Sequence, residues 1–147
     1  MTATTTLAAP PTTPTQSSLP ATSRRPRVLR TGVGAGLAAS IATVAFAVAA
    51  KGIGVDLAVG GKAIPLLGFA PVTFFFALVG TGIAAVLARR ATRPQRTFLA
   101  TTLALTLVSF VPDLTADAHT ATKLALACSH VVAAAMVIPA LASRLSD

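Results

Sequence analysis

The chain has 147 residues, of which 54% are hydrophobic and only 11% are charged, and its mean hydropathy is +0.77. An ordinary soluble domain has about a quarter of its residues charged, so this composition excludes that class and indicates a membrane protein. A net charge of +8 is also typical of proteins that bind nucleic acid. However, the basic residues flank long apolar runs rather than a polar surface rich in aromatic residues, so we expect no nucleic-acid partner.

The chain begins with a tract of Thr, Pro, Ala and Ser, residues 1–23, that has no charge and no periodicity. Such a tract cannot bury enough apolar surface to offset the entropy lost on ordering, so we expect it to be disordered. An arginine cluster, RRPR, follows it. We therefore divide the chain into a disordered cytoplasmic tail, residues 1–27, and a membrane domain, residues 28–147.

Four apolar segments in the membrane domain each predict a transmembrane helix. A spanning helix needs about 20 apolar residues to cross ~30 Å of hydrocarbon. The predicted helices cover residues 29–50, 64–88, 95–111 and 121–142. The third is the shortest because we expect Pro112 to interrupt it. The predicted fold is therefore all-α, a bundle of four transmembrane helices.

The basic residues predict how this bundle is oriented. Nine arginines precede the first segment, join the second to the third or follow the fourth, whereas the other two links hold only three lysines. Because basic residues are enriched in cytoplasmic loops, we expect both termini to lie in the cytoplasm.

An alternative interpretation concerns the first segment. The sequence SRRPRVL, from Ser23 to Leu29, and the later AFAVAA together fit a twin-arginine export signal with a cleavage site. However, Arg27 stands where such signals usually carry an aromatic residue, and the remainder would be a three-helix membrane protein rather than a folded soluble cargo. We therefore expect the first helix to be retained.

Small residues spaced four apart predict where two helices pack together. Gly32, Gly36 and Ser40 share one face of the first helix, and Gly80 and Ala84 share one face of the second. Small residues let helix backbones approach closely in lipid, so we expect these two stripes to face each other. A second pair of stripes is expected to join the third and fourth helices: Thr102, Thr106 and Ser109 against Ala125, Ser129 and Ala133.

The stretch from Ser109 to His130 contains both histidines and two of the four carboxylates. With the third helix ending at Pro112, we expect Asp113 at the outer interface. His130 is expected ~15 Å along the fourth helix, with Lys123 on nearly the same face. An ionisable residue at that depth normally faces the bundle interior or water. The sequence thus predicts a water-accessible notch with Asp113 at its rim, His130 at its floor and Lys123 balancing the carboxylate.

Three interpretations of this cluster are open. In the first, residues 113–123 form a solvated loop and neutral His130 is hydrogen-bonded inside the bundle. In the second, Asp113 and His130 line a polar cavity that binds a ligand or passes protons. In the third, Asp117 and His119 join them as metal ligands, although no tight spacing such as HxxxH supports it. We expect no metal, no cofactor and no catalytic triad, and Cys128 is interpreted as a small packing residue on another helix face.

Three runs of the chain carry a resemblance: IPLLGFAPVTFFFALVGTGIAAVLARR, SFVPDLTADAHTATKLALACSH and VVAAAMVIPALASRL. They resemble a family of small, uncharacterised four-helix membrane proteins of high-GC bacteria, a domain of unknown function. The resemblance covers residues 28–145, and its most distinctive parts are Pro112-Asp113-Leu114 and His130. It implies the four-helix architecture and a bacterial plasma membrane, with no reaction attached.

We therefore interpret the chain as an integral membrane protein, and as a non-enzymatic membrane component or accessory subunit. The alternative is a small transporter or channel-like oligomer that uses the polar notch formed by Asp113 and His130. The expected partners are the lipid bilayer and either another membrane protein or a second copy of the chain.

Overall fold

Long apolar runs become helices because a helix satisfies every backbone N–H and C=O within its own segment, as a membrane interior requires. The computed structural model describes residues 24–145, so the tail expected to be disordered lies mostly outside the described residues. It has four long helices, α1 (Arg24–Gly52), α2 (Phe69–Arg90), α3 (Pro94–Thr115) and α4 (Thr120–Ala142). Each is long and apolar enough to cross a membrane. The prediction of an all-helical chain with four such helices is confirmed at this level.

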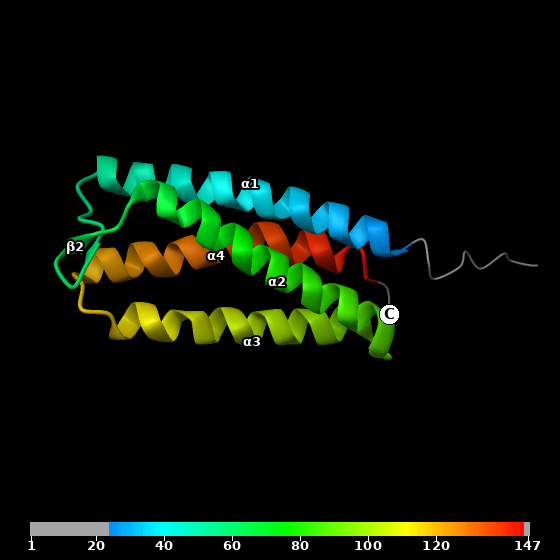
Figure 1. The fold of residues 1–147 in the computed structure, drawn as a ribbon. Helices are drawn as coiled ribbons and strands as arrows, with labels where there is room; N and C mark the ends of the chain where they lie inside the picture. The colour runs from blue at the N-terminus through cyan, green and yellow to red at the C-terminus, as the bar shows by residue number, and fades with distance from the viewer. Residues whose placement is uncertain (1–23, 146–147) are drawn as a thin grey trace, which may run out of the picture.

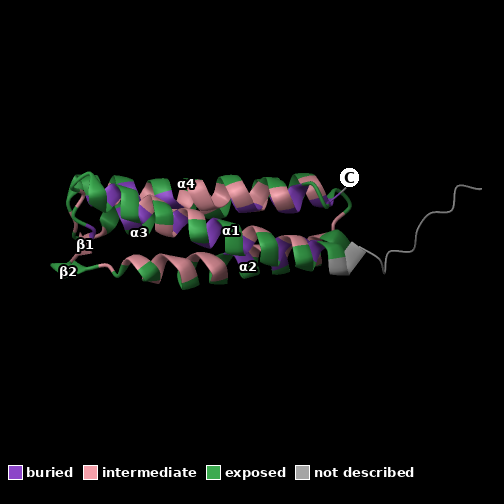
Figure 2. Ribbon diagram, turned by 90° about the horizontal axis from the view of Figure 1, so that it is seen from above, coloured by how far each residue is buried: buried purple, intermediate pink, exposed green. Residues whose placement is uncertain are grey.

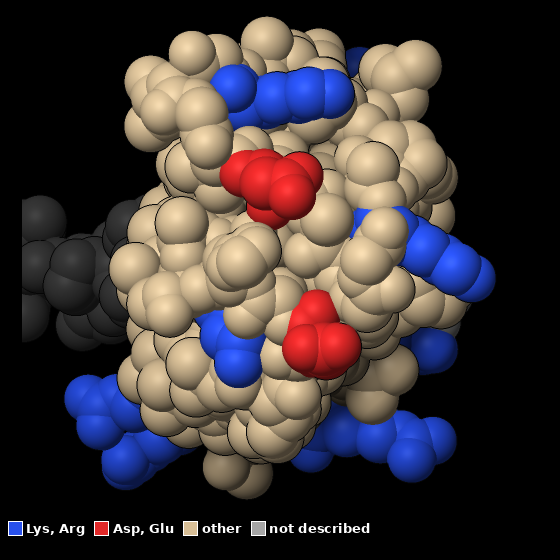
Figure 3. Space-filling model, turned by 90° about the vertical axis from the view of Figure 1, so that its left-hand side faces the viewer, with Lys and Arg blue, Asp and Glu red and all other residues tan. Residues whose placement is uncertain are grey.

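The helices run alternately up and down, so their links gather at two ends of the bundle (Figure 1). We call one the arginine end; it comprises the start of α1, residues 89–96 and the end of α4. We call the other the hairpin end; it comprises residues 51–68 and 116–123. Figure 3 looks onto the hairpin end, where acidic side chains lie apart from one another among basic and uncharged groups.

The hairpin end is built around a short β-hairpin of β1 (Ala58–Val59) and β2 (Lys62–Ala63), which is followed by the 3-10 helix η2 (Leu66–Gly68). Its turn residues, Gly60 and Gly61, have φ of +56° and +72°, as a two-residue hairpin turn that favours glycine requires. The Gly60 N–H donates to the Asp117 carbonyl at 2.7 Å. This bond joins the α1–α2 link to the α3–α4 link.

The third helix differs from the prediction, because α3 does not end at Pro112. It continues to Thr115 and has 22 residues, the same number as α2. Pro112 lies in the last turn, where its missing N–H costs only one helical hydrogen bond. The helix continues past it because Ala116 N–H donates to the Pro112 carbonyl at 2.9 Å. The predicted short third helix is therefore wrong.

The hydrophobic core is thickest toward the arginine end. There Phe98 of α3 and Leu141 of α4 are fully buried, together with Ala39 and Ala84. A smaller apolar cluster around Ala47 and Leu57 lies toward the hairpin end. Figure 2 shows that buried residues occupy narrow stripes, while the outward faces of all the helices are exposed or half-buried. Figure 1 shows α2 approaching α3 near the arginine end and separating from it toward the hairpin end.

Candidate functional site

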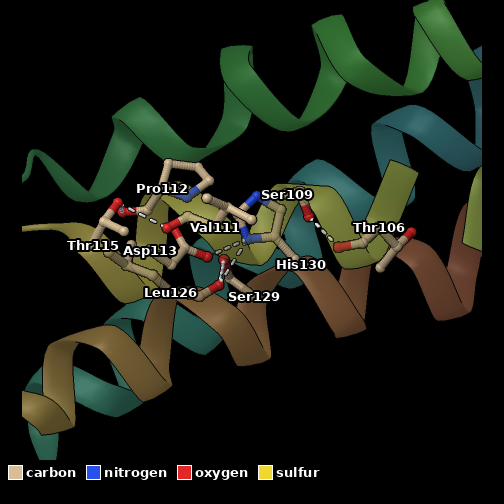
Figure 4. Close-up of polar contacts among 9 residues, drawn as sticks. All are labelled: Thr106, Ser109, Val111, Pro112, Asp113, Thr115, Leu126, Ser129 and His130. Atoms are coloured by element: carbon tan, nitrogen blue, oxygen red, sulfur yellow. Dashed lines mark hydrogen bonds and ion pairs between the residues drawn. The ribbon is translucent and has the colours of Figure 1, made fainter. Parts of the chain in front are cut away.

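Asp113 and His130 form an ion-pair contact between α3 and α4. The Nδ1 atom of His130 lies 2.9 Å from Oδ2 of Asp113 (Figure 4). The His130 side chain is 38% exposed and the Asp113 side chain is 10% exposed. Side chains on a helix lean toward its N-terminus. In the antiparallel pair, Asp113 therefore leans toward the bundle centre and His130 toward the hairpin end, so the two side chains meet. The predicted notch is reversed in one respect: Asp113, expected at the rim, is the more buried partner.

The orientation of the His130 ring is set by three neighbours. Nδ1 lies 3.0 Å from the Leu126 carbonyl as well as near Asp113. A carbonyl oxygen only accepts hydrogen bonds, so Nδ1 carries a hydrogen. The Phe110 ring meets the imidazole edge-on, with ring centroids 6.3 Å apart. The other ring nitrogen, Nε2, points away from Asp113, toward the side of the bundle where α2 lies (Figure 4).

The carboxylate of Asp113 depends on this single neighbour. Its Oδ2 atom is buried and, apart from the approach to Nδ1, has no hydrogen-bond partner among residues 24–145. A buried carboxylate that loses its partner is strongly unfavourable. The contact with His130 is therefore the interaction that makes the burial of Asp113 tolerable.

A cavity of about 380 Å³ lies between α2, α3 and α4, and His130 is part of its lining. Most of the lining is apolar. Thr73 of α2, whose hydroxyl pairs with that of Thr43 on α1, is part of the lining. Four further hydroxyl groups come from α3 and α4: Thr102, Thr106, Ser109 and Ser129. Each donates its hydrogen to a carbonyl of its own helix, as Ser109 does to Thr106 at 2.6 Å. Their oxygen atoms therefore keep free acceptor capacity toward the cavity.

The other residues predicted for this site lie apart from the pair. Lys123 does not balance Asp113; its Nζ atom donates to the Leu114 carbonyl at 3.0 Å, at the exposed end of α3. Asp117 and His119 are exposed in the α3–α4 link. Within residues 24–145, no group of three or more His, Cys, Asp or Glu side chains is arranged to hold a metal ion.

Cys128 lies two positions before His130 but faces another direction. It is exposed and borders a recess formed with α1 residues such as Phe46 and Ala49. It does not line the cavity of His130. The thiol therefore cannot serve as a reporter of that cavity.

The predicted small-residue stripe of α1 lies against α2. A Cβ atom at Gly32 would overlap the side chain of Thr81, and one at Gly36 would lie 3.0 Å from the Cβ of Ala77. The Ser40 hydroxyl reaches the Ala70 carbonyl of α2 at 3.1 Å. Within the described chain, these are the glycines at which a neighbouring helix leaves no room.

The stripe predicted on α2 is only partly the surface that α1 meets. Ala84 is fully buried in the core. Gly80 is not at the seam, because a Cβ atom there would meet nothing within 4 Å, and the residue lines the cavity instead. The face of α2 toward α1 includes Phe74, Ala77 and Thr81. Ala77 and Thr81 are spaced four apart, so the same small-residue spacing could have indicated this face.

The comparisons with known proteins support one part of the resemblance seen in the sequence, namely that the chain belongs to an uncharacterised family. No curated protein and no solved structure matches the chain. A family model matches residues 23–147, which include all four helices. The expectation of an uncharacterised family is thereby confirmed, while the membrane and the bacterial group remain expectations. The chain belongs to the family of unknown function DUF6069.

Proposed function

We propose that this protein is a non-enzymatic, multi-pass component or accessory subunit of a bacterial plasma membrane, with both termini in the cytoplasm. The observation that carries the proposal is the separation of charge along the bundle. The arginines gather at one end: Arg27, Arg30, Arg89, Arg90, Arg93, Arg96 and Arg144. The lysines and the exposed carboxylates gather at the other: Lys51, Lys62, Lys123, Asp56 and Asp117. The positive-inside rule assigns the arginine end to the cytoplasm.

The surface between the two ends supports the same proposal. Large apolar side chains face outward on every helix, including Ile41 at 72% exposed, Phe76 at 63%, Val108 at 63% and Leu124 at 60%. Such a continuous apolar surface is rare on soluble monomers. In a bilayer these side chains contact acyl chains instead of water.

Single-cysteine labelling of intact cells tests this orientation. In a Cys128→Ala background, Asp117→Cys places a thiol at the hairpin end and Thr92→Cys places one at the arginine end; both positions are exposed. A membrane-impermeant thiol reagent should label Asp117→Cys in intact cells and Thr92→Cys only after the membrane is permeabilised. The opposite pattern would overturn the orientation, and labelling of both in intact cells would overturn the membrane placement.

A second candidate function, a small transporter or channel-like oligomer, is supported by the cavity beside the Asp113–His130 contact. From His130 toward the arginine end, the α4 residues that line the cavity are apolar, such as Ala133, Val137 and Ile138. This favours binding of a ligand over passage of protons. Proteoliposomes containing a pH-sensitive dye test the point. A proton leak above that of empty liposomes, lost in Asp113→Asn, would favour conduction, whereas a leak equal to that of empty liposomes would exclude it.

A further inference from the structure

We infer that the cavity between α2, α3 and α4 is a binding site for a lipid-soluble molecule that carries a hydroxyl group and enters from the bilayer. This inference rests on the membrane placement proposed above. It adds what that placement leaves open, namely the chemical class of the ligand and the groups that recognise it.

The size and opening of the cavity fit a small molecule from the membrane phase. Its volume of about 380 Å³ lies within the range of about 300–1,000 Å³ typical of small-molecule sites. Side chains at its border, such as Val72 and Phe76 on α2 and Leu105 on α3, are exposed and lie within the candidate membrane spans. The opening between α2 and α3 therefore faces the hydrocarbon region, and a ligand that reaches it must be soluble in lipid.

The recognition group is Nε2 of His130. The ring cannot turn it away, because Nδ1 is held by Asp113 and by the Leu126 carbonyl. An acyl chain would fill the apolar part of the cavity but would leave Nε2 unpaired, and an unpaired buried polar group is unfavourable. The fixed ring thus selects for a ligand with one polar group.

A hydroxyl group fits this position better than a carbonyl or an ether. Nε2 accepts a hydrogen bond when the imidazole is neutral and donates one when it is charged, and a hydroxyl does both. The hydroxyl oxygens of Ser109 and Thr106 face the same cavity and have already donated their hydrogens within α3. These oxygens can accept a hydrogen bond from the hydroxyl group of a ligand. A carbonyl or an ether has no hydrogen to donate to them.

Photolabelling of the full-length protein in lipid nanodiscs tests the inference with defined probes. The probes are a medium-chain alcohol bearing a diazirine and the methyl ether of the same compound. The alcohol should label residues of α2, α3 and α4 that line the cavity, at least about fivefold more than the ether, the preference that one hydrogen bond provides. Equal labelling by the two probes overturns the choice of a hydroxyl ligand.

Two glycines of α2 provide a matched pair for the location of the site. A Cβ atom at Gly80 or at Gly82 would meet nothing within 4 Å, but Gly80 lines the cavity whereas Gly82 is exposed outside it. Gly80→Phe should fill the cavity and lower labelling of its lining at least about fivefold. Gly82→Phe should label like the wild type. Equal labelling of the two variants overturns the cavity as the site.

The recognition group is tested by replacing both members of the ion-pair contact. The double variant Asp113→Leu with His130→Leu leaves no unpaired charge, and such apolar replacements of buried pairs are commonly tolerated. In this variant the preference for the alcohol over the ether should disappear. A preference that persists assigns the recognition to another group and overturns the role of His130. The cysteine experiment above reports on orientation alone, so failure of that proposal and failure of the site are distinguishable.

Discussion

The two sides of α2 differ in how closely another helix approaches them. Toward α1, Gly32 and Gly36 bring the backbones together, and the hydroxyls of Thr43 and Thr73 share a hydrogen bond of 3.1 Å across the seam. Toward α3, Gly80 and its neighbours border a cavity. Glycine is present at both places, on α1 at the first and on α2 at the second, so glycine alone does not bring helices together. Close approach also needs a complementary face on the neighbouring helix and hydrogen bonds between the two helices.

The hydroxyl groups explain much of this difference. Apolar helices gain no hydrophobic driving force by associating in lipid, so packing and interhelical hydrogen bonds must hold them. Ser40 reaches a carbonyl of α2, whereas Thr102, Thr106 and Ser109 donate to carbonyls of α3 itself. The Asp113–His130 contact beside the cavity joins α3 to α4 and does not reach α2. The following variants test this contrast.

The largest effect is expected for His130→Leu, which removes the contact between α3 and α4 beside the cavity. It leaves the buried Asp113 carboxyl group without its partner, and because His130 is itself partly exposed the free energy of unfolding should fall by about 3 kcal/mol. Thermal unfolding in detergent measures the change. The double variant with Asp113→Leu should recover most of the loss. A His130→Leu protein as stable as the wild type would show that the pair does not hold α3 against α4.

Overpacking of the closed seam should come next. A leucine at Gly32 collides with Thr81, so Gly32→Leu should lower the free energy of unfolding by about 2 kcal/mol. Gly34→Leu is the control, because Gly34 is exposed on the same helix and a Cβ atom there meets nothing within 4 Å. The same unfolding measurement applies, and equal stability of the two variants would contradict the close seam.

A smaller effect is expected for the hydrogen bond that crosses the seam. Thr43 is buried and shares its hydroxyl hydrogen bond with Thr73. Thr43→Val keeps the shape but removes the hydroxyl, and interhelical bonds of this kind contribute about 0.6 kcal/mol. A double-mutant cycle with Thr73→Val isolates the shared contribution. Strict additivity of the two variants would mean that the bond contributes nothing.

The smallest effect is expected for Gly80→Ala on the open side. The added methyl group enters the cavity without touching another helix, so stability should stay within about 0.5 kcal/mol of the wild type. Gly36→Ala is the informative comparison, since its methyl group would press on Ala77 at 3.0 Å. If Gly80→Ala were the more damaging of the two, the assignment of the open and closed sides would be reversed.

The helices were predictable because their signal is local. Length and hydropathy are properties of each segment by itself, and all four predicted segments correspond to helices. The error at Pro112 is also local: the rule that proline breaks a helix is strong in an interior but weak in the last turn, where little helix remains to be lost. Sequence spacing gave no way to see that residues 112–115 would stay helical.

The candidate site was less predictable because it depends on three helices at once. The sequence groups Asp113 and His130 in one notch, with Asp113 at the rim and His130 at the floor, and the structure brings the two side chains into direct contact. Spacing does not show which way a long side chain leans. It predicts Lys123 beside the carboxylate, whereas the Lys123 Nζ atom donates to the Leu114 carbonyl. The cavity itself follows from the separation of α2 from α3, which no residue pattern in either helix encodes.

The hydrogen bonds at the hairpin end have a consequence for how the protein is made. The Gly60 N–H donates to Asp117, and the Thr122 hydroxyl donates to the carbonyl of Asp56, so both bonds connect the first half of the chain to the second. Synthesis proceeds from the N-terminus, so α1, the hairpin and α2 exist before Asp117 and Thr122 have been added. Until α3 and α4 arrive, the exposed N–H of Gly60 at the hairpin turn has water in place of the Asp117 carbonyl as its hydrogen-bond partner.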